Sequence, residues 1–345
     1  MSQYFLSHIE RMAGYVPGEQ PRDGGFIKLN TNENPYPPSP RVLEAIKIAV
    51  GDRLRLYPDP VGTAFRKVAA NLHGVEPEMI LAGNGSDDLL TIITRAFAGP
   101  GDLVAYPTPS YILYRTLAEI QGARSVEIPF VEKWDLDPAS FARVHPRVAF
   151  IANPNSPSGT ALSVEGLRTI ARAVDCPLVI DEAYVNFAEG DAVDLIRDHP
   201  NVIVLRTLSK GYSLAGLRVG YLIARPEMVA GLIKVKDSYN CDTLSLAGAC
   251  AALEDRDYLA ETSSRIKATR SRLTAAMRGL GYLVPESQAN FVWCAEGPPA
   301  SATYEILKAR KILVRLMRYP GQADGIRITV GTDAEIDSLL EALKA

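Results

Sequence analysis

Lys210 is the residue around which covalent chemistry could be built in this 345-residue chain. It lies in the segment TLSKG, residues 207–211, directly after the apolar run of residues 202–205. A lysine amine attacks an aldehyde once burial or a neighbouring cation lowers its pKa. Arg218, eight residues further on, is a cation of this kind. Taken alone, however, Lys210 is better explained as a solvated surface charge, because most lysines are exposed.

Asp181 offers a second reactive group. It closes a run of four apolar residues, 177–180, and begins the segment DEAY at residues 181–184. An isolated carboxylate at a buried strand end would take up a proton, so Asp181 requires a partner. We therefore expect a cation or a protonated ring nitrogen beside it.

Three further loops carry unusual polar residues. The segment AGNGSDD, residues 82–88, enters a helix whose first amide groups suit a phosphate, although such a segment is often only a turn. In PTPSY, residues 107–111, Tyr111 could lie flat against a planar ligand or could be a packed surface residue. The segment NPNSPSG, residues 153–159, is rich in turn formers and amide side chains, and a structural loop is the alternative there.

These loops require a particular set of elements to hold them. From residue 41 to residue 225, helix-like segments alternate with short apolar runs, which is typical of a doubly wound, mainly parallel α/β sheet. Each of the five loops follows an apolar run. Because ligands bind beyond the carboxyl ends of parallel strands, the pattern predicts that these loops meet at one edge of the sheet.

The combined set of residues indicates one cofactor. A lysine amine, an acid for a pyridinium nitrogen, a phosphate-binding turn and an aromatic ring for stacking are the groups that pyridoxal phosphate requires. The GNGSDD turn lacks the lysine of a nucleotide-binding P-loop. We therefore expect pyridoxal 5'-phosphate rather than a nucleotide.

The chain divides into three parts by pattern. Residues 1–40 contain many prolines and glycines and read as an arm laid over the rest. Residues 41–238 form the expected large, cofactor-binding α/β domain, and residues 239–345 a smaller α+β domain with one long helix over roughly residues 245–280.

Composition excludes several classes of function. The net charge is −3 and no run of lysines and arginines occurs, which argues against nucleic acid or an anionic membrane as a partner. The four cysteines and four histidines are too scattered for a zinc or iron–sulfur site, so we expect no metal. Residues 1–15 have neither a basic start nor an uninterrupted apolar stretch, which predicts a cytoplasmic protein.

The motifs together resemble a known family. They are LNTNENP at residues 29–35, YPD at 57–59, GNGSDD at 83–88, DEAY at 181–184, TLSK at 207–210, LAGLR at 214–218 and RITVGT at 327–332. The chain resembles the fold-type I pyridoxal phosphate enzymes, and within them the histidinol-phosphate aminotransferase branch of the class I and II aminotransferases. The likeness extends over nearly the whole chain.

The resemblance implies roles for the cofactor-binding residues. Lys210 would bind the cofactor aldehyde and carry a proton between the substrate α-carbon and cofactor C4′. Asp181 would pair with the ring nitrogen, Tyr184 would bond the ring hydroxyl, and Tyr111 would stack on the ring. The phosphate would be held by Gly85, Ser86, Asp87, Ser209, Arg218 and, from a second subunit, Tyr57. Sharing of Tyr57 implies a homodimer.

The same comparison implies a substrate-binding set. Arg327 would bind the anionic end of the substrate as a bidentate partner, with Arg315 beside it. The other members would be Tyr15, Asn34 and Asn290. The alternative for the two arginines is a salt-bridged position on the surface.

One position departs from the family pattern. The family pattern NNPTG places an asparagine on the ring hydroxyl, whereas this chain has Ser156 at the matching position of NSPSG. Either Ser156 replaces that amide, or Asn155 or Asn153 reaches into the site. The loss of an amide donor affects the tuning of the cofactor rather than its presence.

The resemblance implies transfer of the amino group of L-histidinol phosphate to 2-oxoglutarate. Within the same fold, an aromatic amino acid transaminase and a decarboxylase of a phosphorylated amino acid are the alternatives. A binding or regulatory module that holds the cofactor without turnover is a further alternative, against which intact Lys210 and Asp181 argue.

Overall fold

The computed structural model describes residues 4–14, 18–20, 24–319 and 323–344. Its largest sheet has seven strands in the order β2-β8-β7-β6-β5-β3-β4, of which β8 alone runs antiparallel to its neighbours. The strands are β2 (Ile80–Gly83), β8 (Gly220–Ile223), β7 (Val202–Thr207), β6 (Leu178–Asp181), β5 (Val148–Ala152), β3 (Leu103–Thr108) and β4 (Arg124–Pro129). This confirms the mainly parallel, doubly wound sheet.

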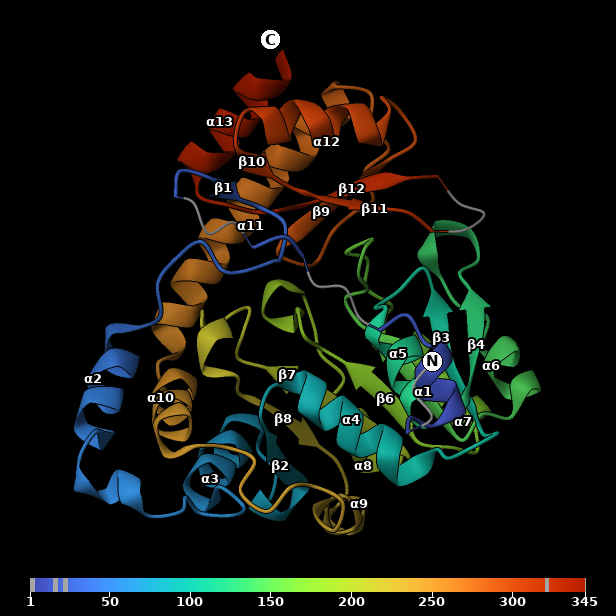
Figure 1. Cartoon of the computed structure of the whole chain (residues 1–345), viewed down its shortest axis with the longest axis vertical. Coiled ribbons are helices and arrows are strands. Elements are labelled where there is room, and N and C mark those ends of the chain that lie inside the picture. Colours follow the sequence, from blue (N-terminus) through green and yellow to red (C-terminus); the bar gives the residue numbers. More distant parts are fainter. Residues whose placement is uncertain (1–3, 15–17, 21–23, 320–322, 345) are drawn as a thin grey trace.

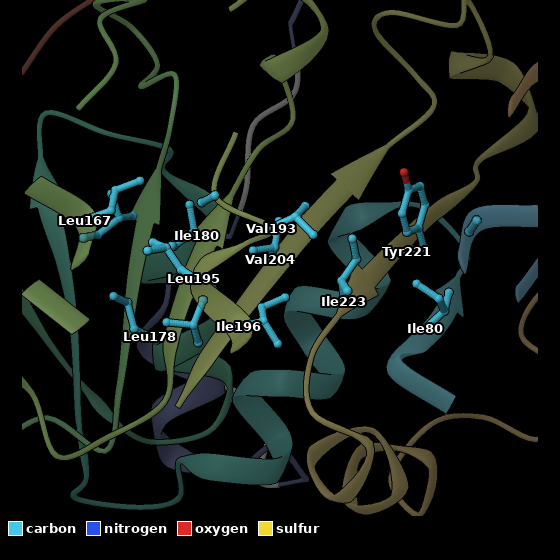
Figure 2. Packing of buried hydrophobic residues seen from close by; sticks show 14 of the residues in the cluster. Ile80, Leu167, Leu178, Ile180, Val193, Leu195, Ile196, Val204, Tyr221 and Ile223 are labelled. Carbon is cyan, nitrogen blue, oxygen red and sulfur yellow. The ribbon is translucent and has the colours of Figure 1, made fainter. Parts of the chain in front are cut away.

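Both faces of this sheet are buried, because successive side chains of a strand point to opposite sides. In β6, Leu178 and Ile180 lie in the core of one face and Val179 in that of the other. Figure 2 shows Leu178 and Ile180 packed with residues of β7, β8 and the neighbouring helices. An uninterrupted apolar run in the sequence is the consequence of this double burial.

Helices cover each face of the large sheet (Figure 1). Buried residues on the first face come from α2 (Pro40–Ala49), α3 (Thr63–His73), α6 (Pro138–Val144), α7 (Val164–Ala173), α8 (Leu195–Asp198) and α10 (Thr243–Glu254). On the second face they come from α4 (Ser86–Phe97), α5 (Leu113–Ile120) and α9 (Pro226–Ile233), and the short α1 (Ser7–Arg11) lies beside α5.

A smaller body is built on a three-stranded antiparallel sheet with the order β11-β12-β9. Its strands are β9 (Phe291–Ala295), β11 (Arg315–Met317) and β12 (Gly325–Thr329). The helices α11 (Arg256–Gly279), α12 (Ala300–Ala309) and α13 (Asp333–Lys344) pack on it around a core of their own. In Figure 1 this body lies above the large sheet.

The arm contributes to this smaller body. Its strand β1 (Ile27–Lys28) pairs in parallel with β10 (Ile312–Leu313), and Leu29 is buried in the core between the small sheet and its helices. Figure 1 shows the blue arm beside the orange and red carboxyl-terminal elements. The residues that follow Leu29 are thereby carried towards the carboxyl ends of the large sheet's strands.

The helical stretch predicted over residues 245–280 is two helices. The chain leaves helical geometry at Asp255, between α10 and α11. Buried residues of α10, such as Ala249 and Leu253, lie in the core of the large sheet, whereas those of α11, such as Ile266, lie in the small core.

Five short 3-10 helices complete the described secondary structure: η1 (Asp52–Arg55), η2 (Pro77–Met79), η3 (Glu132–Trp134), η4 (Val185–Phe187) and η5 (Ala215–Leu217). Among the described helices, none is both long and apolar enough to cross a lipid bilayer.

Candidate active site

A cavity of about 260 Å³ lies where the strand ends of the large sheet meet the arm and the small sheet. Lining residues come from all three parts of the molecule. Those predicted from the sequence are Ser86, Asp87, Tyr111, Ser156, Asp181, Tyr184, Ser209, Lys210, Arg218, Arg315 and Arg327. The structure therefore brings most of the predicted site residues together.

Lys210 follows β7 by three residues and is only partly exposed. Its Nζ donates a hydrogen bond to the carbonyl oxygen of Thr31 at 3.1 Å. Burial lowers the pKa of Lys210 to about 8, and the positive charge of Arg327 acts in the same direction. The protonated amine still predominates at pH 7, but the neutral, nucleophilic form is populated far more than for an exposed lysine.

Asp181 is the last residue of β6 and is buried. One carboxylate oxygen accepts a hydrogen bond from the hydroxyl of Tyr114 at 2.8 Å, and the other accepts one from the amide of Ala183 at 3.2 Å. Burial raises the pKa of Asp181 to about 6, although the bond from Tyr114 opposes this shift. A cation in the cavity would stabilise the ionised form.

The amino terminus of α4 forms an anion-binding surface with Arg218. Gly85, which precedes the helix, has φ +87°, and a Cβ there would lie 2.6 Å from Nη2 of Arg218. The guanidinium also donates to the hydroxyl of Ser209 at 3.3 Å. The first amides of α4, a hydroxyl and a guanidinium therefore converge where a phosphate would fit, and Gly85 allows the guanidinium to lie close to the start of the helix.

Tyr111 and Tyr184 approach the cavity from different elements. The hydroxyl of Tyr111 donates to a carboxylate oxygen of Asp87 at 3.2 Å, and its ring meets that of Tyr114 edge to face. The hydroxyl of Tyr184 accepts a hydrogen bond from the side-chain amide of Asn32 at 2.9 Å.

Two arginines lie directly opposite each other on neighbouring strands of the small sheet. Arg315 on β11 pairs with Arg327 on β12, and both line the cavity. Arg327 donates from Nη1 to the hydroxyl of Ser156 at 2.9 Å, and its Nε has no hydrogen-bond partner among the described residues. Like charges at directly opposite positions repel, so an anion in the cavity would stabilise this pair.

The structure places the three candidates for the position of the family asparagine differently. Asn155 is buried and uses both ends of its amide on Ser110, Ser158 and the carbonyl of Pro109. The side chain of Asn153 is bonded to the backbone of Leu162. Of the three candidates, only Ser156 lines the cavity, and it is bonded to Arg327.

The remaining predicted residues lie behind or away from the cavity wall. Asn34 donates to the carbonyl oxygens of Lys210 and Gly211, at 3.0 and 3.1 Å. Asn290 is fully buried and donates to the carbonyl oxygen of Asn32. Both therefore support the backbone of cavity residues in this structure.

Tyr57 does not line the cavity of its own chain. Its side chain is 81% exposed, and its ring stacks on that of Tyr239 at 4.5 Å. Tyr15 lies outside the described residues.

The sequence reasoning did not include the arm residues Thr31, Asn32 and Glu33, which all line the cavity. Although burial opposes it, hydrogen bonds from Lys28 and Thr31 hold the pKa of Glu33 below its usual range. The expectation that ligands bind in the loops after parallel strands does not apply to these residues, because the arm follows no strand of the large sheet. The only signal was the motif LNTNENP itself.

A buried ion pair connects the carboxyl ends of β6 and β7, next to the cavity residues. Glu182, next to Asp181, contacts Nη2 of Arg206 at 2.8 Å, and the same nitrogen lies 3.3 Å from Asp191. Glu182 directly follows β6, and Arg206 lies within β7. The pair therefore links the carboxyl ends of β6 and β7, next to Asp181 and close to Lys210 in the sequence.

The residues of the cavity fit pyridoxal phosphate. Ser86, Ser209 and Arg218, which line one part of the cavity, suit the phosphate, and Asp181 lines the same cavity and suits a protonated ring nitrogen. The partly deprotonated amine of Lys210 suits the aldehyde.

Comparison with known proteins agrees with this geometry. The family model described as aminotransferase class I and II matches residues 25–343. A histidinol-phosphate aminotransferase of Rhodopirellula baltica is 49% identical over 337 residues, covering 96% of this chain and 92% of that protein. Histidinol-phosphate aminotransferase 1 of a Nostoc species is 50% identical, covering 100% of this chain and 98% of that protein.

Solved structures show the same fold. The crystal structure of histidinol-phosphate aminotransferase from Sinorhizobium meliloti in complex with pyridoxal-5'-phosphate matches with a TM-score of 0.91 and 30% identity, covering 99% of this chain and 97% of that chain. An aspartate aminotransferase from Thermus thermophilus with maleate matches in fold, with a TM-score of 0.82 and 21% identity, over 92% of this chain and 91% of that one. This chain therefore belongs to the class I and II aminotransferase family.

Proposed function

We propose that this chain is a histidinol-phosphate aminotransferase. It transfers the amino group of L-histidinol phosphate to 2-oxoglutarate, forming imidazole acetol phosphate and L-glutamate, with pyridoxal 5'-phosphate as cofactor. The observation that carries the proposal is the single cavity in which the amine of Lys210 faces the arginine pair of the small sheet. The two relatives of this name at 49% and 50% identity support it.

The cofactor would be held by residues of the large sheet. Its phosphate would bind the amides of Ser86 and Asp87, the hydroxyl of Ser209 and the guanidinium of Arg218, while Asp181 would pair with the ring nitrogen. When bound, the cofactor supplies the electron-accepting ring that acidifies the hydrogen on the amino-bearing carbon of the substrate.

Lys210 has two tasks in this arrangement. Its amine would hold the cofactor through the aldehyde carbon, since an unprotonated lysine amine is the nucleophile that an aldehyde requires. The same amine is also a general base, because a pKa of about 8 allows it to take up a proton and release it at neutral pH. Tyr184 and Tyr111 hold the ring in position on its hydroxyl side and on one face.

Arg315 and Arg327 hold the anionic ends of both substrates. Histidinol phosphate has a phosphate at one end, and 2-oxoglutarate has two carboxylates. Each of the two opposed guanidinium groups presents paired N–H donors in one plane. Such pairs bind two oxygens of a phosphate or of a carboxylate equally well. Tyr15 and Asn290 belong to the same proposed set, Tyr15 next to the substrate and Asn290 through the arm backbone.

The active form is proposed to be a homodimer in which Tyr57 of each chain completes the phosphate site of the other. The 81% exposure of Tyr57 in the single chain supports this, because an aromatic ring so exposed gains from burial against a partner. We also propose a cytoplasmic location, which suits the four unpaired cysteines.

Visible absorbance spectroscopy of the purified enzyme tests the proposal. L-histidinol phosphate, added without a keto acid, should convert the bound cofactor at a far lower concentration than L-phenylalanine does. A preference for phenylalanine would make the enzyme an aromatic transaminase, and release of carbon dioxide from a phosphorylated amino acid would make it a decarboxylase. Absence of a cofactor band would refute both the cofactor and the function.

A further inference from the structure

Asn32 has an unusual position between the two bodies of the molecule. It lies in the arm with φ +58°, in the left-handed region that asparagine tolerates better than most residues. It is 1% exposed, so its polar groups need partners within the protein. Those partners come from the small sheet on one side and from the loop after β6 on the other.

The small sheet fixes the orientation of the Asn32 amide. The hydroxyl of Thr329, on β12, accepts a hydrogen bond from the backbone N–H of Asn32 and donates one to its Oδ1, both at 3.0 Å. Asn290 in turn donates to the backbone carbonyl of Asn32. With Oδ1 satisfied by Thr329, the Nδ2 donor of Asn32 is the group that faces Tyr184.

This orientation determines how the hydroxyl of Tyr184 is used. Because an amide nitrogen only donates, the oxygen of Tyr184 is the acceptor in the 2.9 Å bond to Asn32. The hydroxyl proton of Tyr184 is then directed away from Asn32. Because Tyr184 lines the cavity, its hydroxyl could donate this proton to an acceptor bound in the cavity.

In this chain, the ring oxygen of the cofactor would lack the asparagine amide donor that the family pattern NNPTG places beside it. Ser156 stands in the place of that amide, and its hydroxyl oxygen accepts the bond from Arg327. The amides of Asn155 and Asn153 are bonded to other groups. The hydroxyl of Tyr184, which lines the cavity and accepts from Asn32, is then a donor suited to a ring oxygen on that side of the cavity.

We propose that Asn32 is a positioning residue for the reaction: with Thr329 it orients the hydroxyl of Tyr184 towards the ring oxygen of the cofactor, coupling the arm and the small sheet to the electronic state of the ring. The inference rests on the proposed function for the presence of the cofactor. It goes beyond that function by assigning to Asn32 and Thr329 a role exerted through Tyr184.

The role has a spectroscopic consequence. Loss of a proton from the lysine-bound cofactor changes its visible absorbance and leaves more negative charge on the ring oxygen. A donor to that oxygen favours the deprotonated form and lowers the pKa read from the absorbance. Asn32→Gly, which keeps the left-handed backbone accessible, should therefore raise this pKa by about one unit.

A double-mutant cycle separates this role from general support of the arm. Tyr184→Phe should raise the same pKa by a similar amount, and Asn32→Gly combined with Tyr184→Phe should raise it no further. Thr329→Val should shift it in the same direction, whereas Thr329→Ser should restore the wild-type value. Asn30→Ala is the matched control, because Asn30 is a buried arm asparagine whose amide bonds Glu19 instead of Tyr184.

The outcomes distinguish this inference from the proposed function. A wild-type enzyme without a cofactor band or without turnover of histidinol phosphate refutes the proposed function. A wild-type enzyme with both, in which Asn32→Gly leaves the absorbance pKa unchanged or adds its full shift to that of Tyr184→Phe, refutes the role of Asn32. If Asn32→Gly does not fold, Thr329→Val and Thr329→Ser decide in the same way.

Discussion

At the residue scale, the reactivity of Lys210 depends on how burial and the charges around it shift the pKa of its amine. Burial and the guanidinium of Arg327 both favour the neutral amine, so the pKa of Lys210 falls to about 8. Glu33 and Asp87 act in the opposite direction and limit the shift. The amine is therefore both available as a nucleophile and able to hold a proton at neutral pH.

Capture of the cofactor by the cofactor-free protein should follow this pKa. Only the neutral amine attacks the aldehyde, so the capture rate should rise with pH with a midpoint near 8, and Arg327→Ala should move the midpoint upwards. Stopped-flow absorbance after mixing with pyridoxal 5'-phosphate measures this rate. Lys210→Ala, the control, should fold but form no covalent adduct. A wild-type midpoint near 10 would contradict the prediction.

Removal of Arg327 should act mainly on substrate affinity. In Arg327→Ala the anionic end of each substrate loses a bidentate partner, so KM for both substrates should rise by about 10- to 100-fold while the protein stays folded. Steady-state kinetics and circular dichroism measure the two effects. Arg310→Ala is the matched control, because Arg310 bonds the carbonyl of Ala342 away from the cavity. An unchanged KM would place the anion site elsewhere.

The sequence predicts the cavity residues of the large sheet well and those of the arm poorly. Asp181 ends β6, and Lys210 and Arg218 lie in the loop that follows β7, so one rule about parallel sheets brings them together. Asn32 and Glu33 reach the cavity only because β1 pairs with β10, a contact between residues nearly 300 positions apart. No local pattern encodes a pairing of that separation.

At the element scale, Gly85 allows the start of α4 to lie close to the guanidinium of Arg218. Gly85→Ala would place a Cβ 2.6 Å from Arg218 at φ +87°, so we expect weaker cofactor binding together with a loss of about 1 kcal/mol in stability from the backbone. Gly101→Ala is the matched control, since Gly101 has the same φ but open space around its Cβ position.

Both variants should lose similar stability in urea unfolding, and Gly85→Ala alone should show a cofactor dissociation constant raised by about tenfold or more. Equal cofactor affinity in the two variants would mean that the contact between Gly85 and Arg218 does not shape the phosphate site.

The element pattern was most informative where a strand or helix is apolar on a buried face. The short apolar runs at residues 79–82, 102–106, 147–152, 177–180, 201–206 and 219–224 each correspond to a strand of the large sheet. The strand β4, at the edge of the sheet, was not predicted, because its sequence RSVEIP mixes charged and apolar residues. The break at Asp255 was also missed, because alanine- and leucine-rich helices continue on both sides of it.

At the scale of the whole molecule, sharing of the site between two chains makes a distinct prediction. In a mixed dimer of Lys210→Ala and Tyr57→Ala, one site combines an intact Lys210 with an intact Tyr57. Mixing the two variants at limiting cofactor should therefore give more activity than either has alone, as measured by glutamate formation. Sedimentation should show a dimer, and no gain on mixing would argue against a shared site.

The small body joins segments that are far apart in the chain: β1 pairs with β10, and Leu29 lies in a core that also contains residues of α13. During synthesis, the arm emerges from the ribosome first but has no sheet to join until β10 and β12 are made. The large sheet, whose strands end at residue 223, can assemble earlier. The order of translation thus makes the substrate side of the active site the last part to form.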